Sequence, residues 1–298
     1  MELWIPITIT AAFLQNLRST LQKHLKGVMG TTGATFVRFG FGVPFAALYW
    51  VLLIWGFDAG LPHLNSRFAV WVVIAAISQI LATFLLIHLF SLRNFAVGNA
   101  YARTEPVQTA LFAFVLFGVQ FSLSSMLAIL MAVVGLALIS VARTGISRQQ
   151  LMSSDAGKTA LIGLGSGTLF ALAAIGFQTA ARSVGSEDFV IQAATTLFVG
   201  IVFQTILMLL FMNRKEIIHV IAAWKTSLMV GFVGATATLC WFAAFTLKEA
   251  ALVKVVAQVE MLFAFGSSVL VFKEAINRPE LIGCLLIVGS IFCLILID

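Results

Sequence analysis

Runs of about twenty apolar residues recur along the whole 298-residue chain, separated by short polar or glycine-containing breaks. About 20 apolar residues in a helix cross the hydrocarbon core of a bilayer, which is about 30 Å thick. A helix also satisfies its own backbone hydrogen bonds in lipid, and these runs are too continuous for the strands of a membrane barrel. We therefore expect an all-α membrane protein of ten transmembrane helices, at about residues 4–22, 33–55, 68–91, 95–118, 123–141, 160–182, 188–212, 226–247, 250–272 and 280–297.

The composition argues against a soluble protein. Apolar residues make up 61% of the chain and charged residues 10%, whereas soluble domains contain about 45–50% and about 25%. The net charge of +6 comes from basic residues spread between the apolar runs, so we expect no nucleic-acid partner. The glycine-rich stretch 163–167 lies inside an apolar run and favours helix packing over phosphate binding. We expect no cofactor, no metal and no obligate protein partner; the expected partners are membrane lipid and a small-molecule substrate.

An internal repeat emerges when the chain is compared with itself at an offset of 155 positions. The aligned pairs include Thr83 with Thr238, Arg93 with Lys248, Ala102 with Ala257 and Glu105 with Glu260. Residues 1–145 and 146–298 are therefore expected to be two repeats of five helices each. Because five is odd, the second repeat must enter the membrane from the opposite side. Such inverted repeats are a recurrent basis for alternating access in secondary transporters.

The residues that follow the repeated acid carry a family resemblance. Glu105-Pro106 and the following QTALFAFVLFG, with the second copy VEMLFAFGSSVLVFKEAINRPELIGCLLIVGSIF, resemble the ten-helix EamA-like transporters of the drug/metabolite transporter superfamily. Lys273-Glu274 stands where the family commonly has Gly-Glu, and Met261 stands where the first copy has Pro106. The resemblance implies a multi-pass protein of the cell (inner) membrane that moves a small metabolite, without naming the cargo.

Basic residues are concentrated in alternate connections. The connections after the odd-numbered helices hold eleven Lys and Arg, and those after the even-numbered helices hold three. The positive-inside rule then places the odd connections in the cytoplasm and both termini outside. Many members of the family have cytoplasmic termini, so this chain is expected to differ from them.

Two acids, Glu105 and Glu260, lie about ten residues into predicted helices. A charge at the bilayer centre costs at least about 2.5–3.5 kcal/mol on insertion scales, so such residues face the bundle interior and usually mark a pathway. Burial disfavours the charged form of an acid and lets it exchange a proton near neutral pH. We expect the two acids to be proton or counter-charge sites. The alternative is that they pair with Arg103 or Lys254 only to hold the bundle together.

Several polar residues surround these acids. Tyr101 and Gln108 share a helical face with Glu105, and Pro106 is expected to kink that helix. Arg103 lies on a neighbouring stripe, where it is a candidate ligand for a substrate carboxylate or a member of a structural ion pair.

The second repeat carries a matching stripe. Its residues are Lys254 and Gln258, spaced i and i+4. The two cations Arg103 and Lys254 balance the two acids, which suggests ion pairs between the repeats that break and re-form as the halves rock.

The first predicted helix carries Gln15, Arg18 and Gln22 at i, i+3 and i+7. Three long polar groups on one face either line a cavity or meet another polar face. Gln79 adds interior polarity, and Trp241 is a candidate wall for an apolar part of the substrate. For these last two residues, a structural hydrogen bond or plain packing is the alternative.

We interpret the chain as a secondary transporter that exports a small metabolite, such as an amino acid or amphipathic solute, with proton coupling. One alternative is a lipid-carrier flippase of the same superfamily, which a laterally open cavity facing lipid would favour. A membrane-embedded enzyme acting on a lipid phosphate is less favoured, because no nucleophile is paired with a base.

Overall fold

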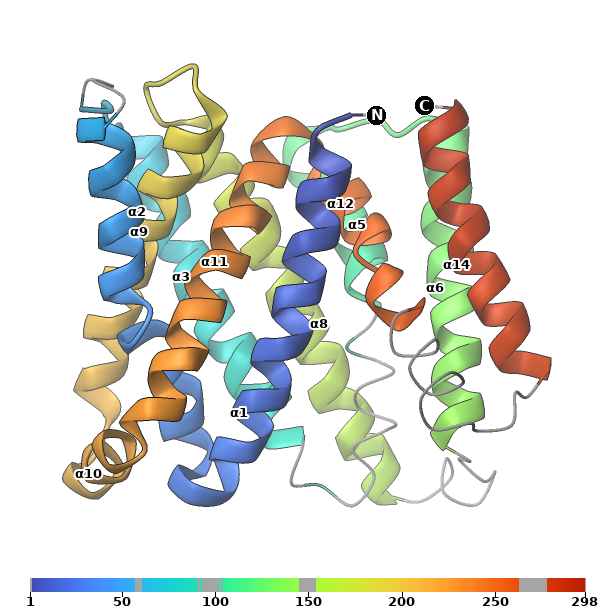
Figure 1. Ribbon diagram of the computed structural model, residues 1–298. Helices are drawn as coiled ribbons and strands as arrows, with labels where there is room; N and C mark the ends of the chain where they lie inside the picture. The colour runs from blue at the N-terminus through green and yellow to red at the C-terminus, as the bar shows by residue number, and fades with distance from the viewer. Residues whose placement is uncertain are drawn as a thin grey trace.

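The computed structural model describes residues 2–56, 61–89, 92, 102, 104–144, 154–262 and 278–297. All regular elements in these ranges are helices that stand side by side (Figure 1), so the all-α expectation is confirmed. They are α1 (Trp4–Gly40), α2 (Val43–Gly56), α3 (Ser66–Leu89), α5 (Glu105–Phe117), α6 (Leu123–Thr144), α8 (Ser154–Arg182), α9 (Phe189–Phe211), α10 (Arg214–Ala222), α11 (Trp224–Leu247), α12 (Ala250–Val256) and α14 (Arg278–Ile297).

Five described stretches are long and apolar enough to cross a membrane, namely Trp4–Gly56, Ser66–Leu89, Gly157–Arg182, Phe189–Phe211 and Trp224–Leu247. The described parts of two further apolar helices, Glu105–Phe117 and Leu123–Ile139, are shorter. Much of the predicted helices at 95–118 and 250–272 lies outside the described residues. The multi-pass character is thus established, whereas the ten-span layout stays a prediction.

The first apolar stretch folds back on itself. At 53 residues it is more than twice as long as one crossing requires. Gly30 interrupts α1 with a φ of 75° and a ψ of −174°, a region that essentially only glycine adopts. The chain reverses there (Figure 1), and Gln22 Nε2 donates a hydrogen bond to Ala34 O across the reversal at 2.8 Å. The break predicted between residues 22 and 33 is therefore a single glycine rather than a loop.

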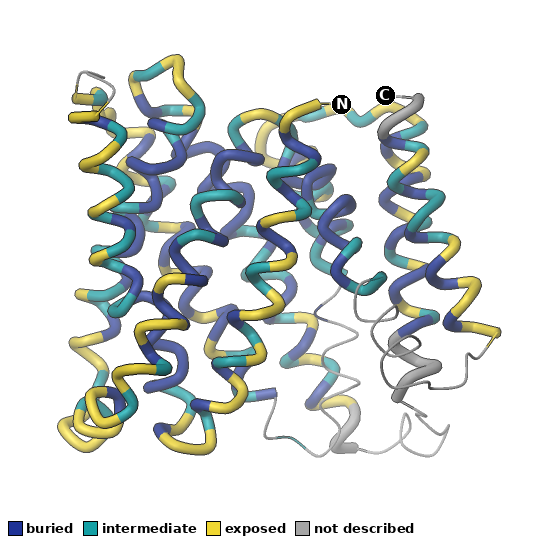
Figure 2. Tube along the Cα trace, in the orientation of Figure 1, coloured by how far each residue is buried: buried dark blue, intermediate teal, exposed yellow. Residues whose placement is uncertain are grey.

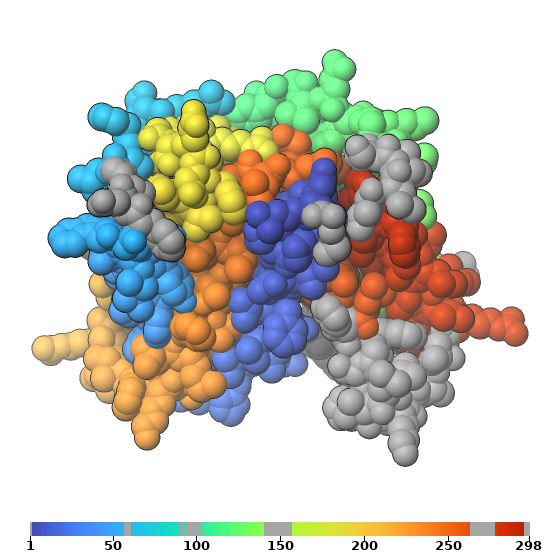
Figure 3. Space-filling model, turned by 45° about the horizontal axis from the view of Figure 1, so that its top comes forward, coloured from blue at the N-terminus to red at the C-terminus, as the bar shows by residue number. Residues whose placement is uncertain are grey.

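The two predicted repeats do not form separate lobes. α1 packs along α11, α3 along α8 and α6 along α14, and each pair joins one half of the sequence to the other. Figure 3 shows the blue residues of α1 beside orange residues of the second half. A site between such pairs is therefore built from both halves of the chain.

Glycines allow α6 and α14 to approach closely. A Cβ added to Gly283 would lie 2.5 Å from Gly135 O, and one added to Gly135 would lie 2.6 Å from Gly283 O. No side chain fits between these backbones, which is the usual role of small residues in membrane helix pairs.

Exposed residues lie along the outer helices and buried residues toward the middle of the bundle (Figure 2), and many of the exposed residues are large and apolar. Leu210 and Phe211 at the end of α9 are each 76% exposed, whereas Phe39, Phe68 and Phe177 are almost fully buried. This pattern suits a protein whose surroundings are hydrocarbon. Polar side chains such as Arg18, Gln22 and Gln204 are buried instead, and they define the interior site.

Candidate functional site

A cavity of about 90 Å³ inside the bundle is lined by charged and amide side chains. We call the five residues Gln15, Arg18, Glu105, Lys254 and Glu260 the polar centre. They come from α1, α5, α12 and the helical turn 259–262, and apolar Leu86, Ala102 and Phe170 complete the wall with Asn16 and Ser19. The structure therefore brings both repeated acids into one cavity.

An ion pair crosses the polar centre. Lys254 Nζ lies 2.8 Å from Glu105 Oε1, and the two side chains are only 11% and 18% exposed. The pair joins α12 of the second half to α5 of the first. Both expectations for the acids, a pair that breaks during transport and a pair that only holds the bundle together, include this contact.

Lys254 has an aromatic neighbour as well as an acidic one. Its Nζ lies 4.2 Å from the centroid of the Trp241 ring, a distance at which a cation is attracted to the ring face. The Trp241 indole Nε1 in turn donates a hydrogen bond to Gln15 Oε1 at 3.0 Å. One chain of contacts thus connects four helices, α1, α11, α12 and α5.

The backbone of the second half is broken just before Glu260. Residues 257–258 form a turn between α12 and the helical residues 259–262, whereas the sequence predicts a continuous helix. The Gln258 backbone N–H donates a hydrogen bond to Val255 O at 3.1 Å, and the Gln258 side-chain Nε2 donates one to Lys254 O at 3.1 Å. The side chain thus satisfies the carbonyl that a regular helix would bond to the main chain, and the helix ends there.

The first half has a matching break. Thr104 is a turn residue and α5 begins at Glu105, with Pro106 in its first turn. The predicted kink at Pro106 is thus a helix start in the described chain, because a proline in the first turn has no carbonyl partner to lose. Glu105 therefore stands at the start of α5, where the helix dipole favours negative charge, and Glu260 follows the turn at 257–258.

Arg18 and Arg38 approach each other behind the cavity. Both are buried, at 3% and 4% exposed. Their stems pack on Gly234, where an added Cβ would lie 3.3 Å from Arg18 Cδ and 3.6 Å from Arg38 Cγ. Arg38 Nη1 donates to Thr83 Oγ1 at 3.0 Å, whereas Arg18 Nε and Nη1 have no hydrogen-bond partner among the described residues.

A second, smaller polar layer adjoins the polar centre. Its cavity, of about 30 Å³, shares Gln15, Phe170 and Lys254 with the first and adds Gln79 and Trp241, along with Arg38 and Thr238. Gln79 Oε1 accepts a hydrogen bond from Gln204 Nε2 at 2.9 Å. Gln79 therefore reaches the cavity wall while tied to α9.

Three other predicted residues do not line these cavities: Gln22 and Gln258 bond to backbone carbonyls, and Gln108 bonds to a side-chain hydroxyl. Gln22 bonds to Ala34 O, Gln108 Nε2 donates to Thr104 Oγ1 at 2.6 Å, and Gln258 caps Lys254 O. Tyr101 and Arg103 lie outside the described residues.

Sequence reasoning missed several residues of the two layers. Asn16 and Ser19 adjoin Gln15 and Arg18 on α1 and follow from the same polar stripe. Gln204 is an amide within an apolar run. Because burying an unpaired amide is costly, its position predicts a polar partner inside the bundle. Phe170 carries no distinguishing signal in a chain with 27 phenylalanines.

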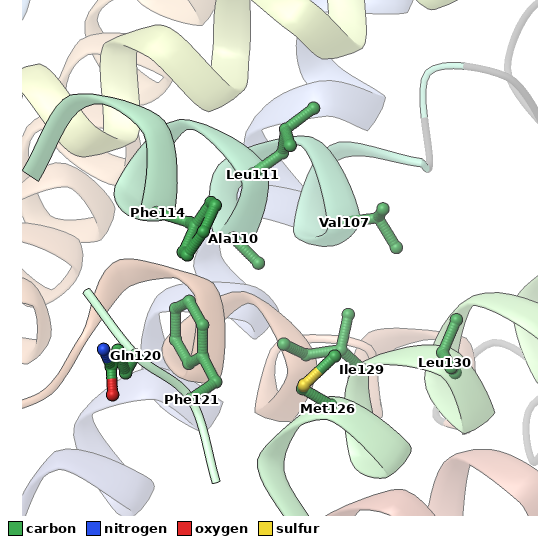
Figure 4. Close-up of a pocket in the computed structure, with 9 residues that line it drawn as sticks. All are labelled: Val107, Ala110, Leu111, Phe114, Gln120, Phe121, Met126, Ile129 and Leu130. Atoms are coloured by element: carbon green, nitrogen blue, oxygen red, sulfur yellow. The ribbon is translucent and has the colours of Figure 1, made fainter. Parts of the chain in front are cut away.

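A larger hollow than the polar centre lies elsewhere, between α5 and α6. It measures about 540 Å³, and Gln120 is its one polar lining residue. Figure 4 shows Val107, Ala110 and Phe114 of α5 facing Phe121 and the α6 side chains across the gap. Four of its lining residues are more than half exposed, namely Leu111, Phe114, Met126 and Leu130, so this groove opens to the side of the bundle. It is apolar and separate from the polar centre.

Comparisons with known proteins concern the family and the fold. Residues 157–296 match the EamA-like transporter family, which is part of the drug/metabolite transporter superfamily. Members of this family are transporters, not enzymes, which does not favour the lipid-phosphate enzyme. Twenty-eight solved chains are similar in structure. One crystal structure, 18% identical, covers 99% of this chain and 96% of its own with a TM-score of 0.72, which shows a shared fold. No curated protein matches the chain.

Proposed function

We propose that this multi-pass membrane protein is a secondary transporter that exports a small metabolite through its polar centre. The proposal starts from the match of residues 157–296 to the EamA-like transporter family. In this proposal the two five-helix repeats are inverted and rock against each other to give alternating access. Protons drive the cycle through Glu105 and Glu260.

The observation that carries the proposal is the ion pair between Glu105 and Lys254. It is largely buried, it lies in a polar cavity, and its two members come from opposite halves of the chain. A relative movement of the halves changes the distance between the two charges. Protonation of Glu105 removes the attraction to Lys254, so proton binding and the movement of the halves are coupled.

The packing supports a two-fold relation between the repeats. Under the 155-residue offset, α3 corresponds to α11 and α1 to α8, so the α3–α8 pair and the α1–α11 pair exchange places. The helix breaks before Glu105 and Glu260 also correspond. Discontinuous helices at a repeat interface are typical of transporter binding sites.

Transport by purified protein in liposomes tests the proposal. A panel of radiolabelled amino acids and other small metabolites is offered under an imposed pH gradient. We expect at least one solute to move with the gradient, and Glu105→Gln to abolish this proton-linked flux. Glu187→Gln, which removes an exposed acid between α8 and α9, serves as the control and should transport normally. Undiminished proton-linked flux in Glu105→Gln would rule out the role of Glu105.

The lateral groove between α5 and α6 favours a second candidate function. It is apolar, open to the side and large enough for an acyl or prenyl chain, as a lipid-carrier flippase requires. None of its lining residues belongs to the polar centre, which a polar headgroup would have to cross. Movement of a fluorescent polyprenyl phosphate across the same liposomes, with no flux of any soluble solute, would favour the flippase.

A further inference from the structure

Arg18 is a buried cation for which the described part of the chain supplies no partner. Its side chain is 3% exposed and lines the polar centre, yet Nε and Nη1 meet no acceptor among the described residues. The ion pairs between described residues involve Arg182, Lys248 and Lys254, and none involves Arg18. Burying an unpaired charge is costly, so such a group persists where a ligand completes it.

The surroundings of Arg18 increase its attraction for an anion. Arg38 lies directly behind it, since both stems pack on Gly234. Arg38 has a neutral partner, Thr83, which leaves its charge uncompensated by any described carboxylate. Glu105 is already paired with Lys254. Glu260 is the second acid of the cavity, so the three cations Arg18, Arg38 and Lys254 outnumber the two acids there by one.

We infer that Arg18 binds a carboxylate of the transported solute. This inference rests on the proposed transport function and specifies its substrate class, a small organic acid or zwitterion. The planar guanidinium offers parallel N–H groups that match the two oxygens of a carboxylate. Phe170 and Trp241 flank the adjoining cavities and supply apolar surface for the remainder of the solute. Arg38 is a positioning residue that acts through its charge and through packing against Arg18.

Thermal stabilisation of the detergent-purified protein tests this assignment, because a ligand that binds the folded state raises its melting temperature. The probes are the common amino acids and short mono- and dicarboxylic acids, each compared with its carboxamide of similar size. We expect one or more acids to raise the melting temperature and the matching amides to have no effect. Arg18→Gln should weaken binding of those acids by tenfold or more, since it removes a charge-assisted bidentate contact. Arg18→Lys should retain part of the affinity.

The stability of the ligand-free variants separates a binding role from a structural one. If Arg18 has only a binding role, ligand-free Arg18→Gln should melt no lower than the wild type. If Arg18 were part of a structural ion pair, the variant would melt at a lower temperature. Arg182→Gln, at the exposed pair with Glu249, is the control and should keep the wild-type affinity for acids. Equal stabilisation by acids and amides, wild-type affinity in Arg18→Gln, or stabilisation by no acid on the panel overturns the inference.

The same measurements distinguish the inference from the transport proposal. Arg18-dependent binding of an acid without flux in liposomes would leave the binding site standing and remove the transporter. Flux of neutral or cationic solutes that is insensitive to Arg18→Gln would leave the transporter standing and remove the carboxylate site.

Discussion

The Lys254 ammonium group lies between a carboxylate and the face of an aromatic ring. Glu105 lies 2.8 Å from its Nζ, and the Trp241 ring centroid lies 4.2 Å away. In a setting of low dielectric, loss of one member leaves the other as a buried unpaired charge, which costs more than loss of both.

A double-mutant cycle measures this coupling. We expect Glu105→Gln and Lys254→Met alone to lower the free energy of unfolding by about 3 kcal/mol each, and the double variant to recover most of the loss. SDS titration in detergent supplies the free energies. The exposed pair Arg182–Glu249, at 2.7 Å, is the matched control and should contribute at most about 1 kcal/mol. Additive losses in the buried pair would show that the two residues act independently.

Charge was predictable at the residue scale, whereas hydrogen-bond partners were not. The cost of charge in lipid identified Glu105, Glu260, Arg18 and Lys254, all of which line one cavity. Periodicity also placed Gln22 beside Arg18, yet its amide bonds to a backbone carbonyl twelve residues along the chain. That contact exists only because the chain reverses. The sequence predicts a break after residue 22, but not which carbonyl the reversal brings to Gln22.

At the scale of elements, helix identity followed from apolar runs, and the breaks followed from individual residues. The chain reverses at Gly30 in the first stretch. At the end of α12, the Gln258 side chain donates a hydrogen bond to the Lys254 carbonyl, which a continuous helix would bond to a backbone N–H. Glycines between residues 27 and 33 mark the first break, which the sequence predicts. The second has no cluster of turn residues, so hydropathy extended the helix at 250–272 through it. Pro106 was visible in the sequence, but whether it kinks a helix or begins one depends on the residues before it.

Gly30→Ala tests the reversal. A Cβ at a φ of 75° and a ψ of −174° is strained, so we expect a loss of about 1–3 kcal/mol in the free energy of unfolding. Gly27→Ala, three residues earlier in regular helix with no atom within 4 Å of the added Cβ, is the control and should be neutral or slightly stabilising. Equal melting temperatures for the two variants would contradict the reversal at Gly30.

At the scale of the whole molecule, the start of α1 and the end of α14 lie at the same end of the bundle, opposite α10 (Figure 1). Arg214 and Lys215 begin α10, and Lys225 lies in the first turn of α11 beside it. The positive-inside rule therefore predicts that the α10 end is cytoplasmic and that both termini are outside.

Labelling of intact cells with a membrane-impermeant maleimide decides the orientation. We expect Glu187→Cys, in the connection between α8 and α9, to react from outside, and Lys215→Cys to react only after the membrane is permeabilised. The three native cysteines, Cys240, Cys284 and Cys293, lie within apolar helices, and the wild type measures their background. The opposite labelling pattern would place the termini in the cytoplasm.

The small volume of the polar centre has a consequence for affinity. A cavity of about 90 Å³ holds roughly three water molecules at the density of the liquid, far less than a metabolite needs. A solute can therefore enter only when the helices have parted. The free energy needed to part them is subtracted once from the free energy of binding. The solute's measured dissociation constant then equals the intrinsic constant divided by the fraction of molecules that stand open.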